Sequence, residues 1–420
     1  MTLKTRGTAL AAVALTSLLA LTACAPGGEP ANTEGGEHDH GHGSEEGATE
    51  VAGAKPRVVL TYEGGLMVLD AETLEVVDDF ELEGFNRINE AGDGRHVLVS
   101  TTGGWAPLDA GSWTVPHGDH THSYTADPSL GDVIVPANTP GHVVVHDDYT
   151  TLFDDGTGDV TVFETGSWTD AVEAGSIEPV RTYQTEEPHH GVAVASQDGT
   201  LFVTHGNEES RDGAIVLDEN DEEIASTTEC PGIHGETVAG ESVVAGCEDG
   251  VILLHGDHFH KIDSPDEFGR IGNQFSAEDS SIVLGDYKDD PDAEGIALDT
   301  ISLIDTEEES IQLVELDTEY TYSNLARGMD GSVLVLGTDG ALRVIDPETG
   351  EATSTIDVID EWTPPIEWQK SHPAIHEELG YVYVTDPANN QIHRVDYASG
   401  EVVTTADLEH APNEIVVTSG

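Results

Sequence analysis

The sequence contains few basic residues. Lys and Arg total 15 against 82 Asp and Glu in 420 residues, which gives a formal net charge of −67 at pH 7. Proteins that bind nucleic acids need a positively charged surface for the phosphates, so this balance excludes nucleic acid as a partner. The acidity suits adaptation to a salty habitat as well as it suits attraction of cations. It therefore does not by itself indicate a metal site.

The apolar segment near the N-terminus is too short for an ordinary membrane span. It runs from Ala9 to Leu21, follows two basic residues, and leads into the sequence Leu-Thr-Ala-Cys that ends at Cys24. This order is typical of a lipoprotein signal peptide, which is cleaved at a lipobox before a cysteine that is acylated. We expect residues 1–24 to be that signal peptide and a lipid on Cys24 to anchor an extracytoplasmic protein to the cell membrane. A plain signal peptide with an incidental cysteine is the alternative, and either version exports the chain.

Cysteine is scarce, with three residues in the chain. If Cys24 carries the lipid, Cys230 and Cys247 are left, and an oxidising exterior favours a disulfide between them. A metal site on these two thiolates is the alternative, although the chain has no other thiols to complete it. We predict the disulfide.

The signatures of common enzymes are absent. The sequence has no HExxH, no GxSxG nucleophile elbow, no phosphate-binding loop and no dinucleotide fingerprint. We therefore expect a protein that is not an enzyme. A secreted enzyme or sensor that binds a small molecule stays as the alternative, because some folds assemble active sites from scattered residues.

Residues 25–55 contain Pro, Gly, Glu, Thr and His with almost no apolar side chains. Such a segment cannot offset the entropy of ordering, and we expect a flexible tether. It carries His38, His40 and His42, a short histidine-rich tract that can capture zinc loosely as a secondary site.

From residue 56 onward the sequence consists of short β-rich runs separated by Gly, Asp and Asn turns. Related units recur every 40 to 50 residues, for example PHHGVAVASQDGTLFVTHG and LARGMDGSVLVLGTDGALRVID. This period is typical of a β-propeller with one four-stranded sheet per blade. We predict an all-β propeller over residues 56–420, with eight blades and seven as the alternative. The last strand, 413–418, should join the strands of residues 57–82 and close the ring.

Three of the expected inner strands begin with a histidine: His142, His190 and His234. The starts of inner strands line one mouth of the channel of a propeller, so these imidazoles should converge and bind zinc. His372 lies at a comparable position, and His189 replaces His190 if the register differs by one residue. The alternative is that each histidine only forms a hydrogen bond with a neighbouring blade.

A second histidine cluster is the sequence HGDHTH, with His117, Asp119, His120 and His122. It lies between an outer strand and the next inner strand, so we expect a loop that folds over the same channel mouth. Its carboxylate would ligate the metal or orient a histidine. A plain surface loop is the alternative. The similar sequence HGDHFH follows a strand at an expected blade edge and predicts a solvent-exposed turn.

The sequences HGDHTHSY, PHHGVAV, CPGIHGE and AGCEDGV, together with the histidine-rich N-terminal tract, resemble the AztD family of zinc metallochaperones. The resemblance extends over residues 57–420. It implies a β-propeller that binds Zn²⁺ and passes it to the solute-binding protein of a zinc ABC transporter. It also implicates the HGDHTH loop, the PHHG histidines and His234 in metal handling, and it implies the disulfide. The family is soluble and periplasmic, whereas the lipobox of this chain predicts a tethered protein.

These observations predict a monomeric, lipid-anchored zinc chaperone. The tether collects zinc, the channel mouth holds it, and the ligands of the acceptor replace those of the chaperone one at a time. The expected zinc ligands are a single set from the HGDHTH loop and the inner strands, with His122, His190 and His234 as its principal members. Imidazole also suits copper and nickel, so the preference for zinc depends on the resemblance.

Overall fold

The computed structural model describes residues 47–420. The expected signal peptide, the lipidation site Cys24 and the tract of His38, His40 and His42 lie outside the described residues, and their roles stay predictions. Within the described range, none of the helices combines the length and apolar character that crossing a membrane requires.

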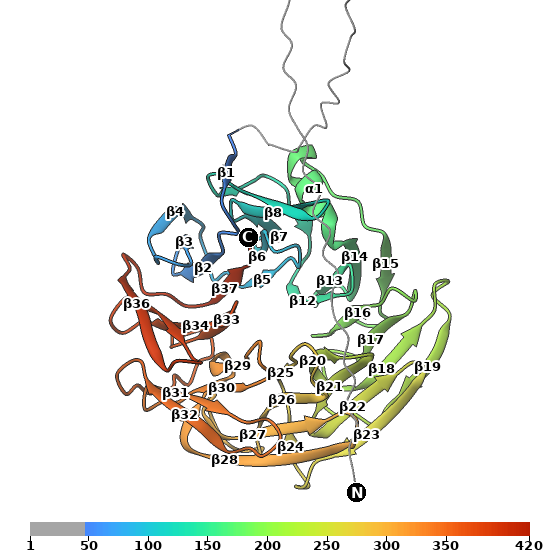
Figure 1. Cartoon of the computed structure of the whole chain (residues 1–420). Helices are drawn as coiled ribbons and strands as arrows, with labels where there is room; N and C mark the ends of the chain where they lie inside the picture. Colours follow the sequence, from blue (N-terminus) through green and yellow to red (C-terminus); the bar gives the residue numbers. More distant parts are fainter. Residues whose placement is uncertain (1–46) are drawn as a thin grey trace, which may run out of the picture. The chain divides into compact units, whose positions relative to one another are not determined.

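Eight sheets within residues 47–420 follow one plan, in which four main strands pair in antiparallel order. Figure 1 shows these sheets arranged around a centre, with the first strand of each sheet innermost. The middle strands are short apolar runs buried on both faces, such as RVVLTY in β2 (Arg57–Tyr62), because neighbouring sheets cover both sides. The outer strands are more exposed, as in VVDDFE of β4 (Val76–Glu81), where half-buried residues alternate with exposed ones.

The strands of the first four sheets are, from the innermost outward, β37 (Ile415–Thr418), β2, β3 (Gly65–Asp70) and β4; β5 (Ile88–Glu90), β6 (His96–Thr101), β7 (Gly104–Asp109) and β10 (Ser129–Leu130), with β11 (Val135–Pro136) also on β7; β12 (Pro140–His146), β13 (Tyr149–Asp154), β14 (Asp159–Glu164) and β15 (Arg181–Gln184); and β16 (Ala193–Ala195), β17 (Leu201–Gly206), β18 (Arg211–Leu217) and β19 (Glu223–Thr227).

The other four are β20 (His234–Ala239), β21 (Ser242–Cys247), β22 (Asp249–His255) and β23 (His258–Asp263), with β24 (Gly269–Arg270) beside β22; β25 (Gln274–Phe275), β26 (Ile282–Tyr287), β27 (Leu298–Asp305) and β28 (Ser310–Tyr320); β29 (Leu325–Arg327), β30 (Val333–Leu336), β31 (Ala341–Ile345) and β32 (Ala352–Asp357); and β33 (Ile375–Glu378), β34 (Tyr381–Asp386), β35 (Gln391–Asp396) and β36 (Glu401–Asp407).

The C-terminal strand completes the first sheet. β37 pairs antiparallel with β2, with Val416 opposite Val59, as the sequence predicted for residues 413–418. Contacts between innermost strands continue from β12 through β5, β37, β33, β29 and β25 to β20. The all-β, propeller-like fold is therefore confirmed, whereas the number of blades and the closure of the ring stay predictions.

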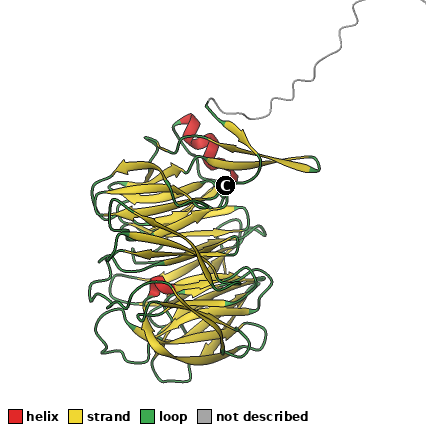
Figure 2. Ribbon diagram, turned by 60° about the vertical axis from the view of Figure 1, so that its left-hand side comes forward, coloured by secondary structure: helices red, strands yellow, loops and turns green. Residues whose placement is uncertain are grey.

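A ninth, three-stranded sheet lies outside this plan. It consists of β1 (Thr49–Val51), β9 (His120–Thr125) and β8 (Ser112–His117), in that spatial order. The segment HGDHTH is therefore the tip of a β-hairpin and not the predicted loop. β1 belongs to the segment predicted as a tether, and its pairing with β9 gives residues 49–51 the backbone partners that their composition alone does not supply. Among residues 47–420, helices are confined to short segments, namely η1 (Thr165–Ser167), α1 (Trp168–Ala174) and η2 (Tyr322–Asn324), as Figure 2 shows.

The predicted disulfide between Cys230 and Cys247 is present. The two cysteines are buried, with Cα atoms 5.0 Å apart, and they join the segment before β20 to the end of β21. In the chain-entropy model a closed loop of this length stabilises the fold by about 3 kcal/mol. The bridge fixes the segment that leads directly to His234.

Candidate metal centre

Residues 47–420 contain two groups of three histidines that are placed to hold a metal ion. In each group, one ring nitrogen per residue lies within 4.8 Å of the corresponding nitrogens of the other two. We call the group of His142, His190 and His234 the central triad. The group of His117, His120 and His122 is the hairpin triad.

The central triad comes from three successive sheets. His142 lies in β12, His190 precedes β16 and His234 begins β20. The pairing register shifts at His142 in β12 and at His234 in β20. Such irregularities change the direction of a side chain at the end of a strand. In β20 the irregularity depends on Gly235, whose φ is +66°. Any other residue there would place its Cβ 2.3 Å from the Gly272 carbonyl oxygen. The fold therefore turns these imidazoles toward one point.

The spacing of the central nitrogens suits zinc. The Nε2 atom of His190 lies 3.4 Å from Nε2 of His142 and 3.1 Å from Nε2 of His234. Zinc binds imidazole nitrogen at about 2.0–2.1 Å in a tetrahedral arrangement, which places neighbouring ligand atoms about 3.3 Å apart. The two distances from His190 thus match the edges of a zinc tetrahedron, and the third pair of ligand atoms lies within 4.8 Å.

Each central imidazole also has an acceptor on its other nitrogen. His190 Nδ1 lies 2.5 Å from Asp155 Oδ2, and His142 Nδ1 lies 3.5 Å from Glu236 Oε2. His234 Nδ1 donates to the Gly272 carbonyl at 2.7 Å. A carbonyl or a carboxylate only accepts, so the ring protons of His190 and His234 belong on Nδ1, and the negative charge of Glu236 favours the same tautomer at His142. The three Nε2 lone pairs are then left for a metal. A cation placed between them satisfies all three, and the carboxylates strengthen the ligands.

Burial keeps His234 available for a metal. Burial, followed by the nearby His142 and Arg270, lowers the pKa of His234 well below the ordinary histidine value. Only the neutral ring binds a metal, so this shift favours ligation.

His190 is the open side of the centre, with 43% of its side chain exposed. Arg211 donates to the backbone carbonyl of His190 at 3.2 Å, so two arginines adjoin the triad.

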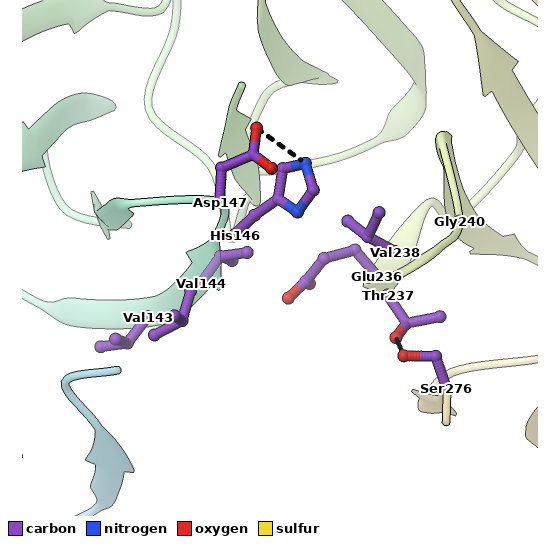
Figure 3. A pocket seen from close by; sticks show the side chains of 10 residues that line it. Val143, Val144, His146, Asp147, Glu236, Thr237, Val238, Gly240 and Ser276 are labelled. Atoms are coloured by element: carbon purple, nitrogen blue, oxygen red, sulfur yellow. Dashed lines mark hydrogen bonds and ion pairs between the residues drawn. The ribbon is translucent and has the colours of Figure 1, made fainter. Parts of the chain in front are cut away.

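A cavity of about 400 Å³ lies beside the central triad, between the inner strands β12 and β20. Val143, which follows His142 in β12, and His146 line one side of the cavity. Glu236 and Thr237 of β20 line the other side. Figure 3 shows these side chains around the cavity, with the ion pair between His146 and Asp147 at one margin. Glu236 therefore belongs to both the cavity wall and the surroundings of the triad.

The hairpin triad is built on adjacent strands of a single hairpin. His117 lies opposite His120, and His122 is two residues further along β9, which places the three side chains on one face. The Nε2 atoms of His120 and His122 are 3.0 Å apart. Again each has a carboxylate at Nδ1: Asp119 lies 3.3 Å from His120, and Glu50 of β1 lies 2.7 Å from His122.

The structure places the predicted zinc ligands in two separate groups. His122 groups with the other histidines of its hairpin, whereas His190 and His234 group with His142. Gly118, with φ of +64°, forms a tight turn between β8 and β9, and β9 pairs with β1 in a separate sheet. The loop expected to fold over the channel mouth is instead an independent metal-site candidate, in which Asp119 is a partner of His120.

Two secondary candidates have structural roles. His189 is buried and contacts the Glu187 carbonyl through Nδ1 and Thr204 Oγ1 through Nε2. His372 is buried in the corresponding way, with Nδ1 donating to the Lys370 carbonyl two residues earlier. Neither belongs to a triad, so the register places His190, not His189, at the centre.

Sequence reasoning missed the carboxylates that contact the histidines. Asp155 follows β13 and Glu236 belongs to β20, so each reaches a histidine of a different sheet. Glu50 lies in the segment predicted as a tether. No local motif marks these residues, because their contacts depend on how the sheets pack.

Comparison with known proteins identifies a curated relative of this chain. No protein-family model matches the chain. The zinc chaperone AztD of Citrobacter koseri is 24% identical over 366 residues, which cover 84% of this chain and 83% of that protein. This homology confirms the resemblance to AztD found in the sequence, and the relative is a zinc chaperone, not an enzyme.

Solved structures show the same fold. The crystal structure of Citrobacter koseri AztD has a TM-score of 0.76 and 22% identity, covering 88% of this chain and 99% of that one. The structure of apo AztD from the same organism has a TM-score of 0.73 at 21% identity, with 87% and 98% covered. The dihydro-heme d1 dehydrogenase NirN matches with a TM-score of 0.56 and 10% identity, over 86% of this chain and 74% of that chain.

Proposed function

We propose that this chain, as a homologue of a zinc chaperone, is an extracytoplasmic zinc metallochaperone that delivers Zn²⁺ to the solute-binding protein of a zinc ABC transporter. The observation that carries the proposal is the convergence of three imidazoles from three different sheets, with Nε2 of His190 at the spacing of zinc ligands from Nε2 of the other two. Zinc is the cargo, and the central triad is its main holding site.

The central triad suits temporary holding. Three imidazoles supply three of the four ligands of a tetrahedral zinc ion, which leaves a position for water or for a ligand of the acceptor. Zinc has no redox chemistry and no geometric preference from its d electrons, so ligands exchange one at a time. His190, the most exposed of the three, is the first that an incoming protein can replace.

Charges near the triad balance holding against release. Asp155 strengthens its imidazole ligand because it accepts the Nδ1 proton of His190, and the carboxylate of Glu236 places negative charge 3.5 Å from Nδ1 of His142. Arg211 and Arg270 place positive charge beside the same rings. Repulsion between these guanidinium groups and Zn²⁺ lowers the free energy needed to release the ion to an acceptor.

The hairpin triad is a second, exposed zinc site in this proposal. Its ligands lie on one hairpin, whose strand β9 pairs with β1. The N-terminal segment with His38, His40 and His42 and the hairpin capture zinc. The chain is a monomer outside the cytoplasm, and a lipid on Cys24 anchors it to the cell membrane.

A transfer experiment tests the proposal. The zinc-loaded chain is mixed with the apo solute-binding protein of the zinc ABC transporter, the two are separated, and zinc is counted in each. We expect the acceptor to gain zinc faster than from free zinc buffered to the same concentration. The variant His190→Ala/His234→Ala should deliver less, whereas His205→Ala, an exposed histidine paired with Asp212, should behave as the parent.

Failure has a distinct result. If the purified chain binds no zinc, and cells without it grow normally under zinc limitation, the chaperone function is wrong. The alternative of a secreted enzyme or sensor then stands, with its small molecule in the cavity between β12 and β20.

A further inference from the structure

The tetrapeptide His-Gly-Asp-His occurs twice in the chain. It forms the turn of the hairpin triad at residues 117–120, and it recurs at residues 255–258 in the turn between β22 and β23. A third histidine follows two residues later in both copies, as His122 and as His260. We call the turn with His255, His258 and His260 the second hairpin.

The two hairpins have the same backbone arrangement. His117 pairs with His120, and His255 pairs with His258, across a two-residue Gly-Asp turn. The turn glycines have φ values of +64° and +63°. In each copy the third histidine lies opposite an apolar residue of the partner strand. The three histidines of the second hairpin therefore lie on one face, in the register that brings the hairpin triad together.

The carboxylate partners also correspond. His258 Nδ1 forms an ion pair with the turn residue Asp257, as His120 does with Asp119. His260 Nδ1 lies 3.4 Å from Glu309, which precedes β28 in the next sheet, as His122 Nδ1 lies beside Glu50 of β1. Both pairs occupy Nδ1 and leave Nε2 as the ligand atom. Carboxylates in this position orient a histidine and increase its affinity for metals.

The two copies differ in their side-chain orientations. The second hairpin is absent from the groups of convergent ligands among residues 47–420, and His255 Nδ1 lies 3.2 Å from Ser242 Oγ. His258 and His260 are 75% and 48% exposed, so packing constrains their rings little. Rotation of exposed side chains occurs in picoseconds to nanoseconds. When the rings bind an ion, the zinc–nitrogen bonds offset the side-chain entropy that the histidines lose.

We propose that the second hairpin is a third Zn²⁺ site, with His255, His258 and His260 as ligands and Asp257 and Glu309 as their carboxylate partners. The site lies on β22 and β23, outside both triads, and it does not require the delivery function proposed above. Because it assembles only around the ion, it binds more weakly than the central triad and exchanges faster.

Zinc stoichiometry tests this site. The full-length chain with His38, His40 and His42 replaced by alanine removes the tether ligands. Zinc bound at saturation is then counted by native mass spectrometry. We expect three ions per chain. Adding His258→Ala/His260→Ala should reduce the count to two, and His120→Ala/His122→Ala should do the same, whereas His205→Ala should leave it at three.

Two outcomes contradict the site: two ions in the parent, or three ions after His258→Ala/His260→Ala. Circular dichroism and zinc retained at the central triad show that each variant is folded. Zinc-edge anomalous scattering from crystals of the unaltered chain gives an independent check, and absence of a peak between His255, His258 and His260 at saturating zinc overturns the proposal. Loss of zinc from the central triad affects only the proposed function, so the two failures are distinguishable.

Discussion

The central triad and the hairpin triad each present three imidazoles, but different parts of the fold hold them. The central ligands come from three sheets and are fixed by register shifts and by a disulfide next to the half-buried His234. The hairpin ligands come from one exposed turn, with a glutamate of β1 as a further partner. A rigid frame lowers the entropic cost of binding an ion. The comparison indicates tight holding at the centre and fast exchange at the hairpin.

The largest expected effect is the loss of a central ligand. His234→Ala should weaken the tightest zinc affinity by at least about 100-fold, because even partners that only contact a ligand are worth about 10- to 100-fold. The same substitution at His122 should leave the tightest affinity within about threefold and remove a weaker zinc. Competition with a zinc-binding dye measures both, and equal losses in the two variants would erase the difference between the centres.

The next effect concerns the carboxylate partners. Asp155→Asn keeps the shape but removes the charge that holds the Nδ1 proton of His190, so zinc affinity at the central triad should fall by about 10- to 100-fold. The matched change Glu50→Gln at the hairpin triad should cost only a few-fold, because that contact is exposed to solvent and ions. A dye titration that ranks the two in the opposite order contradicts the comparison.

A smaller effect of opposite sign is expected from the arginines. Arg270→Gln removes a positive charge that acts on His234, so the central triad should bind zinc more tightly, on the order of fivefold. Release to an acceptor should slow by a similar factor, which stopped-flow measurement with a chromophoric chelator can record. The hairpin triad contacts carboxylates instead, so its affinity should not change.

The smallest effect is on the stability of the apo protein. Burial lowers the folded-state pKa of His234, so the unfolded chain binds more protons once pH falls below about 6.5. The stability from this group is present above that pH and is lost as pH falls toward the folded pKa. The unfolding free energy of the parent should therefore fall more steeply than that of His234→Gln, by up to about 1.4 kcal/mol per pH unit. Denaturant titrations at pH 7.5, 6.0 and 5.0 measure this, and parallel curves would contradict it.

Local signals in the sequence were sufficient to predict the inner strands, the pairing of the last strand and the disulfide. Turn-to-strand transitions such as PGH and PGIH recur at the blade period, so His142 and His234 could be assigned to inner strands, and β12 and β20 contain them. The pairing of residues 413–418 with the first strands also followed, because the last repeat lacks room for a full sheet. The disulfide was predictable because two cysteines remained for an exported chain.

The sequence could not give the contacts between sheets. The position of HGDHTH depends on the pairing of β9 with β1, which comes from a segment that looks unstructured by composition. The choice of His190 over His189 depends on one residue of register, because one ring meets the centre and the other is buried against Thr204. Asp155 and Glu236 reach their histidines from other sheets, and only the packed structure brings them together.

The most direct test of the central claim is the position of the first zinc ion. Crystals of the full chain with one equivalent of zinc, measured at the zinc absorption edge, should give their strongest anomalous peak between His142, His190 and His234. The peak should lie about 2.0–2.1 Å from each of the three Nε2 atoms. A strongest peak at the hairpin triad or elsewhere, with the central triad empty, would contradict the account.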